Sequence, residues 1–382
     1  MIDESNEIND EENEPEEKDV IELDRYDISV NLIQPNLETW VSMIDKGTVI
    51  IPPFQRDFRW NIEKSSKLIE SFLFGLPVPP IFLYQDDKNN NKLLVIDGQQ
   101  RLLSIYFFMK GTFPKSGIRI FNDYKPIVDF YNSVPKEDFI EFKLSCISEK
   151  WNGLTYSLLD ESDVNWFAGK PLWAITVRQI MPDLKKINSM FYIFERLNTG
   201  GEPLTPMEIR KALNYDKYYK LIEGFNQSLN WRKIYGKDAE NTKLHDIELI
   251  LRFFALQNWE EYKEPMKEFL NNYLHNNAKM EDDGTLRDRF ERTCKIIVEA
   301  CGEKPFHFSW RRNLAMMDSF MVLTSKNIDK LSVDLLKDIF NKCKENVDII
   351  ETLKSRVNVK TDVLIKRFTL VSSIFQEVLG NL

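Results

Sequence analysis

The segment Leu93–Lys110 constrains the fold of this chain more than any other stretch. Leu93–Ile96 (LLVI) predicts a buried strand, Gly98 predicts a tight turn, and Arg101–Lys110 predicts an apolar helix that ends near Gly111. A strand that passes through one glycine into an apolar helix requires a sheet with that helix packed on it. The segment therefore predicts an α/β layer at this place in the chain.

Further elements are predicted on both sides of this segment. Asn61 predicts a helix N-terminus and Gly75 its C-terminus, and Thr205 with Glu208 predicts a capping box at the start of another helix. A helix is also predicted over Ile187–Leu197, ending at an Asn-Thr-Gly-Gly turn. The predicted strands are Asp24–Val30, Thr48–Ile51, Ile81–Tyr84, Phe139–Cys146 and Leu172–Val177.

Composition and charge limit the domain organisations that this chain can have. The 382 residues are 43% hydrophobic and include 26 Phe and 8 Trp, enough for a large core. The net charge of −9 arises within residues 1–19, which hold ten acids and one base, so the rest of the chain is balanced. We predict an α+β protein with a disordered acidic tail over residues 1–20, an α/β domain over 21–214 and a mostly helical domain over 215–382.

The cysteines and the apolar runs predict the cellular setting. Cys146, Cys294, Cys301 and Cys343 are widely spaced and form no Cys-x-x-Cys pair, which indicates reduced, buried thiols. The N-terminus is acidic, and no apolar run approaches the roughly 18 residues of a membrane span. We expect a cytoplasmic protein without a membrane partner.

The turn from Asp97 to Arg101 (DGQQR) is a candidate phosphate site. Asp97 ends the strand, Gly98 allows the turn, and Gln99 and Gln100 fall in the first helical turn, where backbone N–H groups attract anions. Arg101 adds a guanidinium fork suited to phosphate oxygens, and Asp97 is a candidate Mg²⁺ ligand. The alternative is a structural helix N-terminus in which Asp97 caps the helix and pairs with Arg101. The spacing alone leaves both interpretations open.

A second candidate site is the segment Gln55–Trp60 (QRDFRW). Its two arginines enclose an aromatic residue and follow Pro52-Pro53, an arrangement that can clamp a phosphate and stack a base. An ordinary loop held by salt bridges explains the same residues, so this segment alone does not decide between them.

The chain resembles a known family over roughly residues 45–214. Four blocks carry the resemblance in order: IIPPFQRDFRW (Ile50–Trp60), LIESFLFGLPVPPIFLY (Leu68–Tyr84), LLVIDGQQRLLSIYFF (Leu93–Phe108) and FYIFERLNTGGEPLTPMEIRKALN (Phe191–Asn214). They resemble the ParB/sulfiredoxin-like domain of the GmrS–GmrD type IV restriction enzymes and of the related SspE. The resemblance implies a ParB/sulfiredoxin-like α/β domain followed by a mostly helical domain.

The resemblance also implies a nucleotide pocket. The family's Asn-Thr-Gly-Gly turn falls on Asn198–Gly201, with Glu208 and Arg210 in the next helix. The implied nucleotide-binding residues are Gln55, Arg56, Gly98, Gln99, Arg101, Asn198, Thr199 and Gly200. The implied catalytic residues are Asp97, Gln100 and Arg101, with Asp97 as the metal ligand.

Taken together, these assignments imply a protein of anti-phage defence or modified-DNA restriction that binds and hydrolyses a nucleoside triphosphate with Mg²⁺ or a similar divalent cation. The first alternative is a non-catalytic sensor of nucleotide or modified DNA that acts with a separate nuclease subunit. It arises because His245, His275 and His307 show no His-Asn-His spacing, so we expect the HNH nuclease half of full-length relatives to be absent. DNA is a further candidate partner, and we expect a homo-oligomer.

A metal-dependent DNA endonuclease is the third alternative. Asp129 or Asp138 precedes Glu141-Phe142-Lys143 on a predicted strand, the spacing of Asp…Glu-x-Lys nucleases. The same Glu-x-Lys pattern arises by chance on amphipathic strands. Small basic patches at Trp310–Arg312 and Lys360–Phe368 could contact DNA phosphates, with solvated helix faces as the default explanation.

Overall fold

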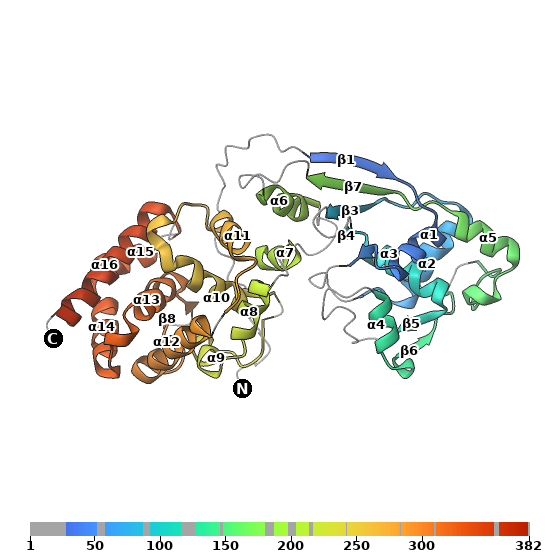
Figure 1. Ribbon diagram of the computed structural model, residues 1–382. Coiled ribbons are helices and arrows are strands. Elements are labelled where there is room, and N and C mark those ends of the chain that lie inside the picture. Colours follow the sequence, from blue (N-terminus) through green and yellow to red (C-terminus); the bar gives the residue numbers. More distant parts are fainter. Residues whose placement is uncertain are drawn as a thin grey trace, which may run out of the picture. The chain divides into compact units, whose positions relative to one another are not determined.

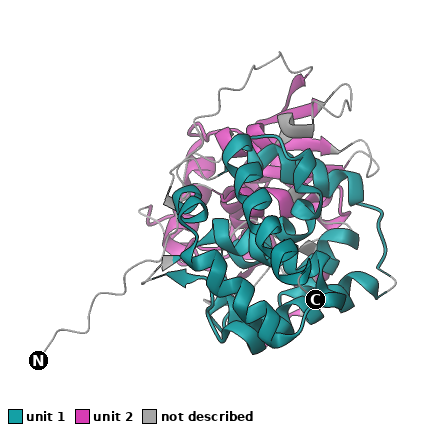
Figure 2. Cartoon of the chain, turned by 90° about the vertical axis from the view of Figure 1, so that its left-hand side faces the viewer, with its two compact units in different colours: residues 1–25, 216–382 teal, residues 26–215 magenta. Residues whose placement is uncertain are grey.

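The described residues form two units (Figures 1 and 2): the first lies within Tyr26–Tyr215, magenta and keyed unit 2 in Figure 2, and the second within Asp216–Leu382, teal and keyed unit 1. The structure, a computed structural model, describes residues 28–51, 58–86, 92–115, 127–145, 148–179, 187–197, 204–213, 217–241, 243–282, 284–308, 311–354 and 359–380.

A mixed sheet lies at the centre of the first unit. The strands of this unit are β1 (Ile28–Ile33), β2 (Val49–Ile50), β3 (Ile81–Asp86), β4 (Lys92–Asp97), β5 (Thr112–Pro114), β6 (Phe139–Glu141) and β7 (Ala174–Gln179). Five of them form one sheet in the order β1-β7-β3-β4-β2, and β5 pairs with β6 in a separate ribbon. The β1–β7 and β3–β4 pairs are antiparallel, whereas β7–β3 and β4–β2 are parallel. Figure 1 shows β1 and β7 side by side although they lie at opposite ends of the unit's sequence.

One face of this sheet carries the main core, with α3 at its centre. The helices of the unit are α1 (Leu37–Asp45), α2 (Ile62–Phe74), α3 (Gln99–Lys110), α4 (Ile127–Ser133), α5 (Glu161–Gly169), α6 (Ile187–Leu197) and α7 (Pro206–Leu213). Every residue of α3 from Leu102 to Phe108 is buried, as expected for a helix that is apolar all round. Phe107 and Phe108 pack edge-to-face with aromatic rings from the neighbouring segments, so α3 is fixed by the core on all sides.

The opposite face of the sheet carries a smaller cluster. Ile96 of β4 is fully buried there together with Phe191 and Phe194 of α6 and Ile209 of α7. Helices α6 and α7 therefore cover the part of the sheet in which β4 ends. This cluster sets the position of the residue that follows Ile96.

The predicted helix ends of this unit are confirmed. The Asn61 side chain accepts a hydrogen bond from the Lys64 amide at 2.9 Å, and Gly75 ends α2 in the left-handed conformation. At α7, the Thr205 amide donates to the Glu208 carboxylate at 2.6 Å and the Glu208 amide donates to the Thr205 hydroxyl at 3.2 Å. These reciprocal bonds are the predicted capping box.

The predicted strand over Phe139–Cys146 is wrong in its length, because β6 ends at Glu141. After that residue the backbone leaves the ribbon: the Phe142 amide donates to the Gly111 carbonyl and the Leu144 amide to the Leu154 carbonyl. Phe142 and Leu144 are buried, so their alternation reflects packing of an irregular segment and not strand pairing. The strand predicted over Leu172–Val177 is present two residues later, as β7.

The second unit is helical apart from a two-stranded ribbon among its described residues, and together with the first unit it makes the chain an α+β protein, as predicted. Its elements are α8 (Lys217–Phe225), α9 (Leu229–Tyr235), α10 (His245–Ala255), α11 (Met266–Asn277), α12 (Thr285–Cys301), β8 (His307–Phe308), β9 (Arg311–Arg312), α13 (Leu314–Lys326), α14 (Val333–Glu345), α15 (Val347–Lys354) and α16 (Thr361–Gly380). No helix in the described ranges is both long and apolar enough to cross a bilayer.

Ion pairs with almost no exposure hold the second unit together. The Arg252 guanidinium binds the Asp318 carboxylate at 2.6 Å, which joins α10 to α13. Arg232 binds Asp246 at 2.9 Å, and Asp246 also accepts from the side chain of Asn226. Buried charges of this kind are costly to leave alone, so each pair fixes the relative position of its two elements.

Candidate functional site

Gly98 forms the turn between β4 and α3. Its φ of 96° lies in the left-handed region that favours glycine, and a Cβ atom there would come within 2.3 Å of Ile81 Cγ2. Both observations exclude any larger residue without rearrangement. The predicted strand, glycine turn and helix are thus present as one rigid corner, with α3 beginning at Gln99.

A β-bulge at Ile96 precedes this corner. Leu83 pairs with Val95, whereas its neighbour Phe82 pairs with Asp97, so Ile96 is the extra residue on β4. Without the bulge, Asp97 would pair with Ile81. The extra residue moves Asp97 into register with Phe82, which packs in the cluster under α6 and α7. Bulges often re-aim a side chain beside a functional site in this way.

Asp97, the last residue of β4, forms an ion pair with Arg101 in the first turn of α3. The Arg101 Nη2 atom lies 2.9 Å from Asp97 Oδ2 and 3.2 Å from the Pro80 carbonyl oxygen. The two side chains are 19% (Arg101) and 35% (Asp97) exposed, so both can be reached from solvent. The Arg101 Nε atom is buried and finds no hydrogen-bond acceptor among the described residues. The guanidinium has five N–H groups, and both bonds named above are made by Nη2.

The N-terminus of α3 adds to this arrangement. The N-cap residue is Gly98, which has no side chain to cap the helix, and the first turn of the helix contains no acidic residue. The first N–H groups of a helix carry partial positive charge that attracts anions. Gln99, the first residue of the helix, is 6% exposed, so it is packed within the corner and little of it faces solvent. The corner combines a positive helix end, a guanidinium and one carboxylate.

Gln100 holds the segment that precedes α2 against this corner. Its Oε1 atom accepts from the backbone N–H groups of Arg59, at 2.9 Å, and Trp60, at 3.1 Å. Phe58 packs edge-to-face on Phe107 of α3, with ring centroids 5.4 Å apart. The end of the QRDFRW segment is therefore attached to α3 by two hydrogen bonds and one ring contact. Sequence reasoning did not find this role, because the partners are about forty residues apart and the acceptor binds backbone groups.

Five of the predicted site residues lie outside the described residues. They are Gln55, Arg56, Asn198, Thr199 and Gly200. The residues on either side of them are placed. Ile51 and Phe58 pack in the main core with Leu102, and Phe194 and Leu204 pack in the cluster that holds Ile96. The described residues that flank these two segments thus lie in the two clusters that hold the β4–α3 corner.

The metal-binding capacity of the described residues is small. They contain no group of three or more His, Cys, Asp or Glu side chains arranged to hold an ion. Asp97 is the carboxylate of the described corner. One carboxylate suits Mg²⁺, which commonly keeps several waters and takes further ligands from a substrate's phosphates.

The nuclease residues predicted as an alternative form a surface pair. Lys143 Nζ lies 3.0 Å from Glu141 Oε2, and both side chains are more than half exposed. Asp138 lies in a 3₁₀ turn just before β6, and Asp129 lies on α4. The Glu141–Lys143 pair is explained without metal chemistry.

Each of the two basic segments of the second unit contains an arginine that packs against the fold, whereas Lys360 and Lys366 are exposed. Arg312 donates to the Tyr235 carbonyl at 2.8 Å and stacks on the Tyr235 ring, and Trp310 lies outside the described residues. In the segment Lys360–Phe368, Arg367 is fully buried, and burial lowers its pKa to about 10. The default explanation of solvated helix faces is therefore wrong for Arg367. Arg312 is partly buried and lies on β9.

The cysteines behave as predicted where they are described. Cys294 and Cys343 are fully buried, Cys301 is partly buried, and Cys146 lies outside the described residues. Burial raises the pKa of the Cys301 and Cys343 thiols to about 12. These side chains are protonated packing groups at neutral pH, without the thiolate character of a nucleophile.

The fold and the corner together define a class: an α+β protein whose first unit presents an Asp-Gly-Gln-Gln-Arg turn at the end of a sheet strand. Residues 37–215 match the family model of the GmrSD restriction endonuclease, N-terminal domain. This match supports the resemblance to that restriction family over the first unit, and the family implies a role in phage defence or restriction. No curated protein matches the chain significantly.

Proposed function

We propose that the first unit binds a nucleoside triphosphate at the β4–α3 corner and hydrolyses it with Mg²⁺ within a restriction or phage-defence system. One observation carries the proposal: Gly98 brings the Arg101 guanidinium, the Asp97 carboxylate and the first turn of α3 to one end of the sheet. A guanidinium fork beside a helix N-terminus is a recurrent phosphate-binding arrangement.

The described side chains support distinct roles in that reaction. Arg101 binds phosphate oxygens through N–H groups that Asp97 and Pro80 leave unused, and its bond to Asp97 orients the carboxylate. Asp97 is the residue that would hold Mg²⁺, which supplies charge neutralisation on the phosphates when bound. Gln55, Arg56, Asn198, Thr199 and Gly200 are proposed to complete the nucleotide pocket.

Gln100 is proposed as a positioning residue in place of a catalytic one. Its carboxamide oxygen already accepts two hydrogen bonds from the backbone at residues 59–60. Since Gln55 and Arg56 precede that backbone by a few residues, Gln100 acts on them through the chain. Its contribution to turnover is expected to come from ordering the segment and not from contact with the nucleotide.

Phosphate release from each of the four nucleoside triphosphates, measured with Mg²⁺ and with or without DNA, tests the proposal. The variant Asp97→Asn keeps the size of the side chain and removes its charge, so we expect turnover to be lost. Glu141→Gln removes an exposed carboxylate of the same unit and serves as the matched control. No phosphate release by the unaltered protein from any nucleotide, or full activity of Asp97→Asn, would refute hydrolysis at this corner.

A second function, nucleotide sensing without hydrolysis, is favoured by one specific observation. A single carboxylate stands at the described corner, it is already paired with Arg101, and the described residues offer no larger metal-binding group. Such a sensor would act with a separate nuclease. Nucleotide binding that persists in Asp97→Asn, is lost in Arg101→Ala and is never accompanied by phosphate release would establish the sensor in place of the hydrolase.

A further inference from the structure

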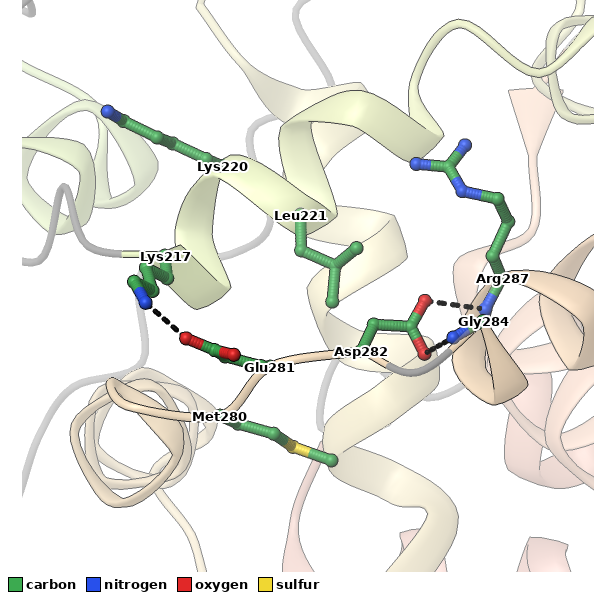
Figure 3. A pocket seen from close by; sticks show the side chains of 8 residues that line it. All are labelled: Lys217, Lys220, Leu221, Met280, Glu281, Asp282, Gly284 and Arg287. Carbon is green, nitrogen blue, oxygen red and sulfur yellow. Dashed lines mark hydrogen bonds and ion pairs between the residues drawn. The ribbon is translucent and has the colours of Figure 1, made fainter.

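A shallow hollow on the second unit lies between the start of α8 and the connection from α11 to α12 (Figure 3). Its volume is about 450 Å³ and it is open to solvent. Residues from three separate parts of the chain line it, including the cations Lys217 and Lys220 of α8 and Arg287 of α12. No part of the proposed nucleotide chemistry uses this hollow.

The charged side chains around the hollow differ in the partners that they already have. Glu281 forms an ion pair with Lys217, and both side chains are about 70% exposed. The Asp282 carboxylate accepts from the backbone amides of Gly284, at 3.0 Å, and Leu286, at 2.9 Å, so it serves as the cap of α12. Because this cap already satisfies the end of α12, the anion-binding capacity of the hollow resides in its side chains.

Arg287 supplies the cation on the α12 side. Its guanidinium lies over the Phe225 ring at 5.1 Å, and within the described ranges it has no carboxylate in ion-pair distance. An aromatic ring under the guanidinium holds it in place and leaves its N–H edge available. The hollow thus has one fixed arginine on one side and two lysines of α8 on the other.

Two apolar side chains and two carboxylates lie between these cations. Figure 3 shows Leu221 between Lys217 and Arg287, the carboxylates of Glu281 and Asp282 next to it, and Met280 at the lower edge. Met280 is 39% exposed, a high value for a large apolar side chain. Apolar groups with cations on both sides suit a sugar–phosphate backbone, in which apolar sugars alternate with anionic phosphates. The two carboxylates are engaged within the protein, Glu281 by Lys217 and Asp282 by the start of α12. An open hollow also suits a polymer that passes over it better than a small ligand that must be enclosed.

We infer that this hollow binds the phosphodiester backbone of DNA, with Lys220, Arg287 and Lys217 contacting phosphates and Glu281 acting as an internal competitor. In the absence of DNA, the Glu281 carboxylate pairs with the Lys217 ammonium in the way that a phosphate would. A phosphate of bound DNA displaces the Glu281 carboxylate from this pair. Contacts of this kind read no base sequence and position the duplex on the protein.

The test is binding of a short fluorescent DNA duplex to the full-length protein, measured by anisotropy over a range of salt concentrations. Each of Lys220→Ala and Arg287→Gln should weaken binding and reduce the slope of log affinity against log salt by about one. Glu281→Gln should change affinity in the opposite direction, because it frees Lys217. A variant that had merely misfolded could not produce this gain.

Lys295→Ala is the matched control, because it removes an exposed lysine from α12 outside the hollow. Equal losses for Lys295→Ala, Lys220→Ala and Arg287→Gln would show a diffuse charge effect and overturn the inference. So would unchanged or weaker DNA binding in Glu281→Gln. The inference would also be overturned if free ATP or inorganic phosphate competed with DNA for binding while none of the variants changed the affinity for DNA, because the site would then take a small anion. The outcome is independent of phosphate release at the β4–α3 corner.

Discussion

Replacing Gly98 with alanine tests how tightly the β4–α3 corner is constrained. An alanine at a φ of 96° loses roughly 1–2 kcal/mol relative to glycine, because its Cβ crowds the following carbonyl. The new methyl group would also meet Ile81 Cγ2 at 2.3 Å in a fully buried position, and overpacking of this kind costs about 1–3 kcal/mol more. We expect Gly98→Ala to lower the free energy of unfolding by about 2–5 kcal/mol.

Gly111 provides the control for this substitution, because it lies at the other end of the same helix. It has a φ of 71°, also in the left-handed region, and no atom of the described residues lies within 4 Å of the place that a Cβ would take there. Gly111→Ala should therefore show the conformational cost alone. The difference between the two variants measures the contact with Ile81.

Urea unfolding gives both free energies, and hydrogen exchange of the α3 amides assigns the transition to the first unit. If Gly98→Ala and Gly111→Ala were equally destabilised, the contact with Ile81 would not constrain the corner and our account of the turn would be refuted. A Gly98→Ala protein that kept full stability would refute the conformational part too.

Three further results are expected from single substitutions. Gln100→Ala should speed hydrogen exchange at residues 59–60 and cost about 1–3 kcal/mol, whereas Gln100→Glu keeps an acceptor oxygen and should restore the protection. Asp318→Asn should destabilise the second unit by about 3–5 kcal/mol in urea titrations, because it leaves the buried Arg252 charge without its partner. Burial raises the pKa of the Cys343 thiol from 9.0 to about 12, so the thiol of the unfolded chain loses its proton at a lower pH than the thiol of the folded chain. The free energy of unfolding should therefore fall as pH rises through that interval. Cys343→Ala should show a smaller fall, and an identical pH profile of the two proteins would contradict the assignment.

Local signals made the corner predictable from sequence. The apolar run, Gly98 and the polar first turn of α3 lie within a few residues of one another, and each acts through backbone preferences that need no distant partner. The same holds for the Asn61 cap and for the Thr205–Glu208 box. The ion pair between Asp97 and Arg101 was also accessible, because Gly98 alone separates Asp97 from the first turn of the helix that carries Arg101.

Contacts between distant residues were not predictable in this way. Gln100 meets the backbone of Arg59 across forty-one residues, and Arg252 meets Asp318 across sixty-six. Nothing in the composition near either residue marks its partner. The bulge at Ile96 depends likewise on how β4 pairs with β3, which alternation along one strand does not reveal. The residues of the candidate site could be identified from local sequence, whereas the long-range contacts that position them could not.

The burial of every α3 residue from Leu102 to Phe108 has a consequence for how proteins of this kind diversify. A fully buried helical stretch offers few positions at which a substitution is neutral, since each change alters the packing of the surrounding core. Strand β4 and helix α3 should therefore accumulate few changes over evolutionary time. New ligand preferences would arise in the exposed connections around them, where insertions and exchanges are tolerated. We therefore expect few substitutions in the β4–α3 corner among related proteins and more in the connections that surround it.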